Sequence, residues 1–248
     1  MPTMTGLSIG GGSSIVWAIA SGGTETTITD SLDGKSYKVH SFLSGTANLV
    51  VSRAGWSQIL LVGGGGGGAT ADKINGGAWG GGGQVLEQEF YLEAATYNIT
   101  TGAGGYPTTP LGSGGPQNGL TGGSSSIVKS GTLTSRTKST DTSPKYLLAV
   151  GGGGGTGYNT PDSNNGTGGI SGDGYPRTTY GVYGSGAGGG GQGSAGLPVT
   201  SYLRTGLSVS YGASGGQVAN SGNGGAGGGF GSISVGSSSG IVVVRYQL

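Results

Sequence analysis

The chain reads Ile59-Leu60-Leu61-Val62 and then six glycines at 63–68; later it reads Tyr146-Leu147-Leu148-Ala149-Val150 and then five glycines at 151–155. An aliphatic run of four or five residues has the length and composition of a buried β-strand. Because the step from strand to polyglycine occurs twice, the chain contains an internal repeat. This repeat favours a packed glycine architecture, and with it a structural or adhesive role rather than catalysis.

Glycine supplies 64 of the 248 residues, whereas an ordinary globular protein has about 7% glycine. Collagen is excluded because its triple helix needs glycine at every third position, and the glycines at 63–68 and 80–83 break that period. Intrinsic disorder is the weaker interpretation, since the formal net charge is +1 and only 8% of the residues are charged. The aliphatic residues also cluster in strand-length runs.

The charge and cysteine content exclude several classes of function. The 11 Lys and Arg residues are dispersed, so we expect no nucleic-acid partner. No stretch approaches the ~18 apolar residues of a membrane span, so we expect no membrane insertion. No Lys or Arg precedes the short apolar segment at 14–20, so we expect no secretory signal. We therefore expect the chain to be synthesised in a cytoplasm. With no cysteine, neither disulfides nor thiolate metal sites can form.

Alternating or aliphatic stretches predict β-strands along most of the chain. The predicted strands are 37–42, 49–51, 58–62, 84–92, 96–101, 126–129, 145–150 and 241–247. Between them lie glycine-rich segments at 63–68, 80–83, 102–105, 151–155, 188–191 and 222–229. No window sustains a helical apolar period free of glycine. The predicted fold class is therefore all-β, with little or no α-helix.

An ordered glycine segment must recover its conformational entropy through backbone hydrogen bonds. Fixing one residue's backbone costs about 1–2 kcal/mol, and glycine lies at the high end without burying a side chain in return. A polyglycine II helix is left-handed and threefold, and it forms hydrogen bonds only with neighbouring chains. Because glycine has no Cβ, several such helices can pack closely. We therefore expect β-strands flanking a bundle of polyglycine II helices, with flexible glycine-rich linkers as the alternative.

The first 35 residues are interpreted as a separate segment. They contain Ile15-Val16-Trp17-Ala18-Ile19 and no charged side chain before Glu25. Such apolar residues are costly to leave exposed, and the segment is too short to form its own core. We expect residues 1–35 to be an anchoring and assembly segment that is buried against other chains. Residues 36–248 are expected to form the glycine-rich β/polyglycine domain.

Candidate catalytic and metal-binding residues are few, and each has a structural explanation. His40, the only histidine, lies in an alternating strand pattern, and without a second histidine or a cysteine a zinc site is not expected. The segment 33–36 lacks the first glycine of a phosphate-binding loop, because Thr29 occupies that position. Glu87 and Glu89 share a strand face, which a solvated sheet explains. We therefore predict no enzymatic activity, no catalytic residue, no metal and no cofactor.

Tyrosines in the polar inserts are the candidate binding residues. Large amphipathic rings on loops suit the recognition of sugars or protein surfaces at a low cost in side-chain entropy. An equally weighted alternative is that these rings cover exposed glycine backbone and seal the ends of the bundle. The candidates are Tyr106, Tyr158, Tyr175, Tyr180, Tyr183, Tyr202 and Tyr211.

Four stretches carry a resemblance to a known family. They are Tyr37-Lys38-Val39-His40-Ser41-Phe42, Ser44-Gly45-Thr46, Ile59-Leu60-Leu61-Val62 into glycine, and Gly240-Ile241-Val242-Val243-Val244-Arg245-Tyr246. With them, residues 36–248 resemble a glycine-rich domain common in tailed-bacteriophage structural proteins. The chain is also similar in glycine content to phage adhesins with polyglycine-helix bundles. That similarity implies receptor contact by loops at the far end of the bundle.

The resemblance implies a non-enzymatic virion component, namely a tail or head fibre or its adhesin tip. Residues 1–35 would attach it to other virion proteins, and the polar inserts would contact a glycan or protein of the host surface. Fibres of this kind are commonly trimeric, so a homotrimer is expected. The alternative is a cellular extracellular-matrix or surface-binding glycine-rich module. A glycan-degrading enzyme is disfavoured because the sequence offers no credible acid/base pair.

Overall fold

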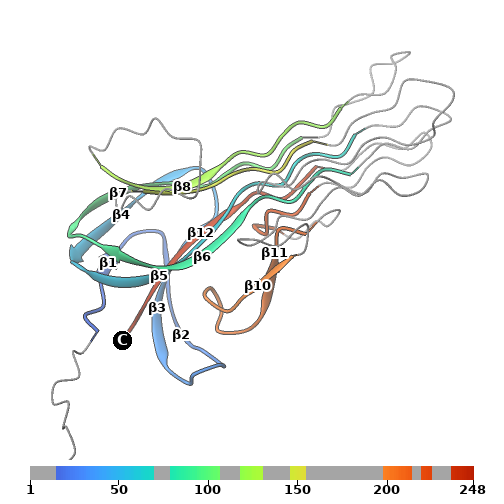
Figure 1. Ribbon diagram of the computed structural model, residues 1–248. Coiled ribbons are helices and arrows are strands. Elements are labelled where there is room, and N and C mark those ends of the chain that lie inside the picture. The colour runs from blue at the N-terminus through green and yellow to red at the C-terminus, as the bar shows by residue number, and fades with distance from the viewer. Residues whose placement is uncertain are drawn as a thin grey trace, which may run out of the picture.

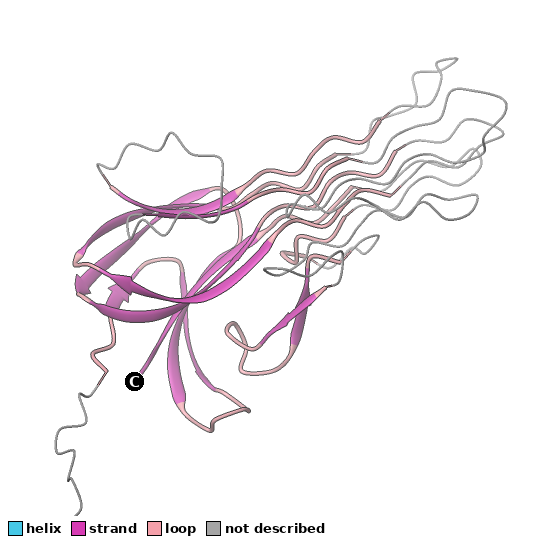
Figure 2. Cartoon of the chain, in the orientation of Figure 1, coloured by secondary structure: helices cyan, strands magenta, loops and turns pink. Residues whose placement is uncertain are grey.

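The computed structural model describes residues 15–69, 79–106, 118–130, 146–154, 198–213, 219–224 and 236–248. Within these residues the protein is all-β and contains no helix, which confirms the predicted fold class (Figure 2). Its strands are β1 (Ile19–Ser21), β2 (Thr24–Thr29), β3 (Ser36–Phe42), β4 (Thr46–Arg53), β5 (Gly55–Val62), β6 (Val85–Leu92), β7 (Ala95–Thr100), β8 (Ser125–Lys129), β9 (Tyr146–Ala149), β10 (Val199–Ser201), β11 (Val209–Tyr211) and β12 (Ile241–Gln247).

Two antiparallel sheets of five strands each pack face to face as a sandwich (Figure 1). The first sheet has the order β1-β4-β7-β8-β9, and the second has the order β2-β3-β12-β5-β6. The hairpin of β10 and β11 packs on the outer face of the second sheet. The hairpin therefore buries part of the outer face of the second sheet, over β3, β12 and the array end of β5.

Alternate side chains of β12 enter two different cores, because successive residues of a strand point to opposite faces of a sheet. Val242, Val244 and Tyr246 pack between the two sheets, whereas Ile241 and Val243 pack beneath the β10–β11 hairpin. With both faces buried, every position of the strand favours an apolar residue rather than every second one. This explains why the aliphatic runs of β5 and β12 are unbroken.

Arg245 is the charged exception in the core beneath the hairpin. Its Nη1 lies 2.7 Å from Asp30 Oδ2, and its Nε donates a hydrogen bond of 2.7 Å to Gln58 Oε1. The guanidinium also lies 4.1 Å from the centroid of the Tyr37 ring. A buried charge is tolerated only when it is paired and hydrogen-bonded, and here Nε and Nη1 both meet such a group. The ion pair between Arg245 and Asp30 holds the turn after β2 against β12, the central strand of the second sheet.

Residues 19–29 belong to the sandwich. β1 pairs with β4 and β2 pairs with β3, each as an edge strand. The predicted boundary at residue 35 therefore falls between two paired strands, and removing residues 1–35 would strip an edge strand from each sheet. Ile15 and Val16, by contrast, are more than half exposed. The anchoring role of the segment stays a prediction.

Glycine-rich segments continue six of the described strands beyond one end of the sandwich (Figure 1). We call these segments together the glycine array. They are residues 63–69 after β5, 79–84 before β6, 101–106 after β7, 118–124 before β8, 150–154 after β9 and 236–240 before β12. The predicted strand-to-glycine steps at 62/63 and 150/151 are both part of it.

Backbone hydrogen bonds join the segments of the array in a repeating order. The amides of Gly63, Gly64 and Gly65 donate to three different segments, at Gln84 O (2.9 Å), Gly123 O (2.9 Å) and Ser238 O (3.0 Å). The next two amides of the run return to the first and second of these segments. A period of three residues is that of a threefold helix. The polyglycine II conformation itself stays a prediction.

The segments lie too close together for side chains between them. An ideal Cβ built on Gly66 would lie 2.0 Å from Gly153 O, and one built on Gly83 would lie 2.0 Å from Gly63 O. Real Cβ atoms essentially never come within 3.0 Å of another heavy atom. Glycine is therefore required at these positions by space rather than by backbone torsion. The described glycine segments are packed, hydrogen-bonded elements.

We predict that Gly66→Ala destabilises the protein by about 3 kcal/mol or more, because the new methyl group would force two backbone segments apart. Gly34→Ala is the matched control. Gly34 has no heavy atom within 4 Å of an ideal Cβ, but its φ is +69°, so we expect a loss of only about 1–2 kcal/mol from torsional strain. Urea unfolding of the two variants measures the difference. Equal losses would contradict the packing argument.

Candidate functional site

A cleft of about 380 Å³ lies along one side of the glycine array. It is lined by Ser44 and Gly45 in the turn between β3 and β4, by residues 101–106, and by Gly236, Ser237 and Ser239. The cleft thus extends from the edge of the sandwich along the array. Its size falls within the roughly 300–1,000 Å³ of small-molecule sites.

The walls of the cleft are held in place by hydrogen bonds. Gly45 O accepts from both the amide (2.9 Å) and the hydroxyl (3.0 Å) of Thr101, which ties the turn to the array. The amide of Ser237 donates to Gly105 O at 3.1 Å, and the Ser237 hydroxyl donates to Gly65 O at 2.5 Å. The shape of the cleft is therefore preformed.

Several groups at the cleft are open to a ligand. Neither the Ser44 hydroxyl nor the peptide groups of Gly104 form a hydrogen bond with any described residue, and Ser44 is exposed. Tyr106, at the end of its segment, exposes 71% of its surface. Fixed donors and acceptors beside a flat, exposed ring can hold a polar ligand in one orientation.

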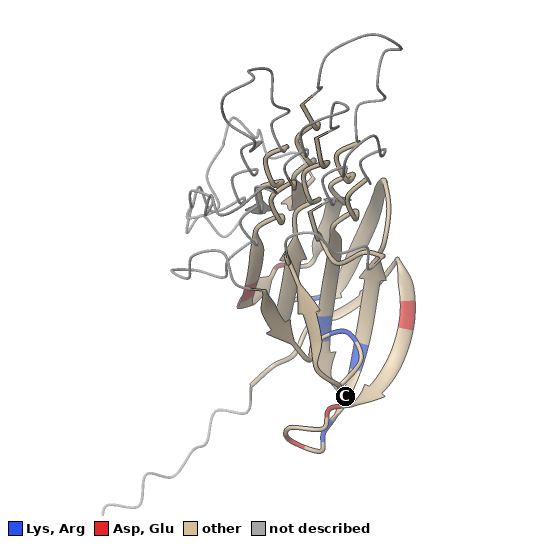
Figure 3. Cartoon of the chain, turned by 90° about the vertical axis from the view of Figure 1, so that its right-hand side faces the viewer, with Lys and Arg blue, Asp and Glu red and all other residues tan. Residues whose placement is uncertain are grey.

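The described part of the array carries no charged side chain, and the charged residues of the described chain lie on the sandwich, its turns and the β10–β11 hairpin (Figure 3). Lys38 and Glu25 pair on the second sheet, with Nζ 2.9 Å from Oε2. Arg245 and Asp30 are buried beneath the hairpin. The cleft is thus lined by hydroxyl, peptide and aromatic groups without a formal charge.

The structure separates the predicted tyrosines. Of the candidates, Tyr106 lies in the cleft, whereas Tyr202 is half-buried in the turn between β10 and β11. Tyr211 was expected in a polar insert, but the structure places it in β11 with its ring completely buried in the core beneath the hairpin. Burial raises the pKa of its hydroxyl. Tyr158, Tyr175, Tyr180 and Tyr183 lie outside the described residues.

Sequence reasoning missed the hydroxyl residues of the cleft. Ser44, Thr101 and Ser237 stand next to glycines or between strands, where serine and threonine are ordinary turn residues. Only the packing of the β3–β4 turn and of segment 236–240 against segment 101–106 brings them together. A hydroxyl residue that directly adjoins a glycine run would have been a usable signal.

His40 is a packed strand residue. Its side chain is completely buried, with Nδ1 2.9 Å from Gly22 O and Nε2 3.4 Å from the Tyr246 hydroxyl. The Tyr246 hydroxyl in turn donates to Ala20 O at 3.2 Å. Burial lowers the pKa of His40 below its ordinary value. The imidazole therefore links β3, β12 and the chain before β2 in its neutral form.

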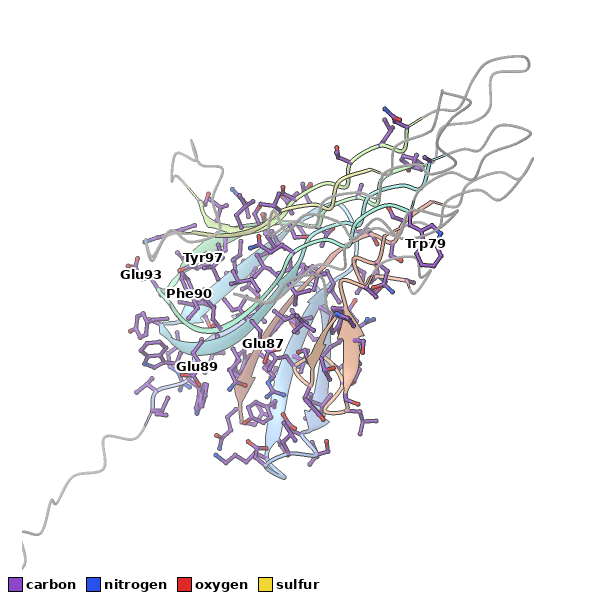
Figure 4. The ribbon with its side chains drawn as sticks, turned by 45° about the vertical axis from the view of Figure 1, so that its right-hand side comes forward. Trp79, Glu87, Glu89, Phe90, Glu93 and Tyr97 are labelled. Atoms are coloured by element: carbon purple, nitrogen blue, oxygen red, sulfur yellow. The ribbon has the colours of Figure 1, made fainter. Side chains whose placement is uncertain are left out.

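The paired glutamates of the sequence analysis lie on β6, at the edge of the second sheet (Figure 4). Glu87 and Glu89 are both exposed, in keeping with a solvated sheet face. Trp79 stands apart from them on the array (Figure 4). Within the described ranges, no three His, Cys, Asp or Glu residues are grouped so that they could hold a metal ion. No helix among these residues is long and apolar enough to cross a membrane.

Comparison with protein families gives a match over most of the chain. The sequence model of a family described as a glycine-rich domain matches residues 41–247, which is most of the chain. A search of curated proteins finds no match. This match confirms that the chain contains a glycine-rich domain. The link to tailed bacteriophages stays a prediction.

We predict opposite effects for two of the candidate tyrosines. Tyr211→Ala should lower the free energy of unfolding by about 3–5 kcal/mol, because it empties the centre of a core. Tyr106→Ala should change it by no more than about 0.5 kcal/mol, because the ring is exposed. Urea unfolding monitored by circular dichroism measures both values. A large loss for Tyr106→Ala would show that its ring supports the array instead of facing solvent.

We also predict that the protein loses stability as the pH falls below about 6.5. The unfolded chain then binds a proton at His40 that the folded chain does not bind, because the folded pKa is the lower one. Urea unfolding at about pH 7.5 and about pH 5.5 measures the loss for the whole protein. His40→Gln, which can still donate to Gly22 O, should show a smaller loss. Equal losses in the two proteins would contradict the role of His40.

Proposed function

We propose, for a chain that belongs to the glycine-rich domain family, a non-enzymatic role as a structural protein of a phage virion. It would be a fibre or adhesin component that contacts the host surface through polar, tyrosine-bearing loops. The observation that carries the proposal is the difference between the two ends of the molecule. An uncharged array projects from one end of the sandwich (Figures 1 and 3). Apolar side chains are exposed at the other end.

The array suits the presentation of loops at a distance from the sandwich. Its segments are joined by backbone hydrogen bonds in several directions, so the array can resist bending as a unit. At the ~3.1 Å per residue of a threefold helix, a six-residue segment would span about 19 Å. The polar inserts of the sequence begin where the described segments end, at residues 69, 106 and 154. These are the loops that we propose to face the host.

The opposite end of the sandwich exposes a set of apolar side chains that we call the apolar base. It comprises Ile15, Val16, Trp56 and Tyr91, which expose 61%, 54%, 43% and 44% of their surfaces. β5 runs from Gly55 to Val62 and then enters the array, so Trp56 lies at the end remote from the array. The rings of Trp56 and Tyr91 meet edge to face, with centroids 5.7 Å apart.

The apolar base supports the assembly part of the proposal. Aromatic residues are enriched in the buried centres of protein interfaces, and exposed apolar clusters are uncommon on monomers. The base extends the predicted anchoring segment, because Ile15 and Val16 come from it and Trp56 and Tyr91 come from the second sheet. We propose that the base packs against further copies of the chain, as a homotrimer, and against other virion proteins.

We predict that mass spectrometry detects the protein in purified phage particles, and that Trp56→Glu removes it from them. The charged side chain would oppose burial of the apolar base, so sedimentation should also show a shift toward monomer. Leu207→Glu is the matched control, because Leu207 is 65% exposed on the β10–β11 hairpin, away from the base. Absence of the wild-type protein from particles would favour the matrix-module alternative. Incorporation of Trp56→Glu at the wild-type level would contradict the role of the base.

A further inference from the structure

We propose that the cleft along residues 101–106 binds a neutral saccharide. The inference rests on the proposed contact with a host surface, and it names the class of ligand and a place for it. The proposed binding place is the side of the glycine array next to the sandwich. It would act in addition to the polar inserts that are proposed to contact the host. The site uses Ser44, Gly104 and Tyr106, of which the sequence analysis had singled out Tyr106 alone, and Ser237 holds its wall.

The absence of charge selects the class of ligand. No side chain that lines the cleft is ionisable near neutral pH, and the described array contributes no Lys, Arg, Asp or Glu. Phosphates, sulfated sugars and carboxylates are recognised by Arg or Lys, and basic ligands by Asp or Glu. None of these partners is present at the cleft. A polar, uncharged ligand is therefore the class that the side chains of the cleft match best.

The polar groups of the cleft match the hydroxyl groups of a sugar. The Ser44 hydroxyl can donate and accept, and the peptide of Gly104 offers one donor and one acceptor, all without a partner among the described residues. Because the array holds segment 101–106 through Gly102, Ala103 and Gly105, these groups are fixed before a ligand arrives. Preformed groups reduce the entropy lost on binding.

Tyr106 supplies the apolar part of the recognition. Its ring exposes 71% of its surface at the rim of the cleft, whereas the buried rings of Tyr97 and Tyr211 are inaccessible. The C–H groups on one face of a pyranose can pack on such a ring while the sugar hydroxyls reach the backbone. A peptide ligand is less well matched, because peptide recognition relies on apolar pockets for anchoring side chains. The wall residues here are glycine, alanine, serine and threonine.

The experiment screens the full chain against an array of neutral and charged oligosaccharides, and titrates the best neutral one by calorimetry. We expect Tyr106→Ala to weaken binding at least 10-fold and Tyr106→Phe by no more than about 3-fold, because the phenyl ring still packs on the sugar. Leu32→Ala, which removes an exposed side chain in the turn between β2 and β3, outside both the cleft and the apolar base, should leave the affinity unchanged. Ser44→Tyr, which fills the cleft from its exposed edge, should weaken binding without unfolding the array.

Each outcome decides the inference. It is overturned if no neutral saccharide binds, if only charged ones bind, or if binding survives both Tyr106→Ala and Ser44→Tyr in folded variants. If the protein is found in virions but these variants leave host adsorption unchanged, the proposed function stands and saccharide binding at the cleft is contradicted. If the protein is absent from particles but binds a saccharide in a Tyr106-dependent way, the cleft inference stands and the proposed function is contradicted.

Discussion

The structure depends on backbone hydrogen bonds that join the glycine segments extending the two sheets. Inside a sandwich, side chains hold facing sheets about 10 Å apart. Beyond Val62 the side chains stop, and Gly64, which continues the second sheet, donates to Gly123 O of the first sheet at 2.9 Å. Ser125 marks the transition, since its buried hydroxyl donates to Val62 O at 2.5 Å. The sandwich core thus gives way to an interior made of peptide groups.

This change of interior restricts where recognition can occur. Side chains cannot point inward in the array, because an added Cβ on Gly64 or Gly66 would meet a carbonyl oxygen at 2.0 Å. Recognition groups must therefore be backbone atoms at the rim or the few outward residues such as Tyr106. Every described residue of the array is uncharged, so its surface is polar without attracting ions. A rigid neutral surface of this kind suits contact with uncharged polar ligands.

The two ends of the sandwich differ for the same reason. At the array end the strands continue into glycine and their hydrogen bonds pass to new neighbours. At the other end the strands turn back, and Trp56 and Tyr91 remain at the surface. Gly55 lets the chain before β1 lie against β5, because a Cβ there would meet Trp17 C and Ala18 N at 2.4 Å. Exposed apolar residues are thereby collected at the end opposite the array.

The sequence by itself determined the all-β class and the strands β3 to β9 and β12, because aliphatic or alternating runs report burial directly. It also indicated ordered glycine, since the strand-to-glycine step is repeated. The tertiary structure decided the rest. β2 is mostly polar and exposed, and β1, β10 and β11 have three residues each, so local pattern is weak and pairing with neighbours fixes them. Likewise, Tyr106 and Tyr211 look alike in sequence, and only the packing of the hairpin on the second sheet buries one and leaves the other at a cleft.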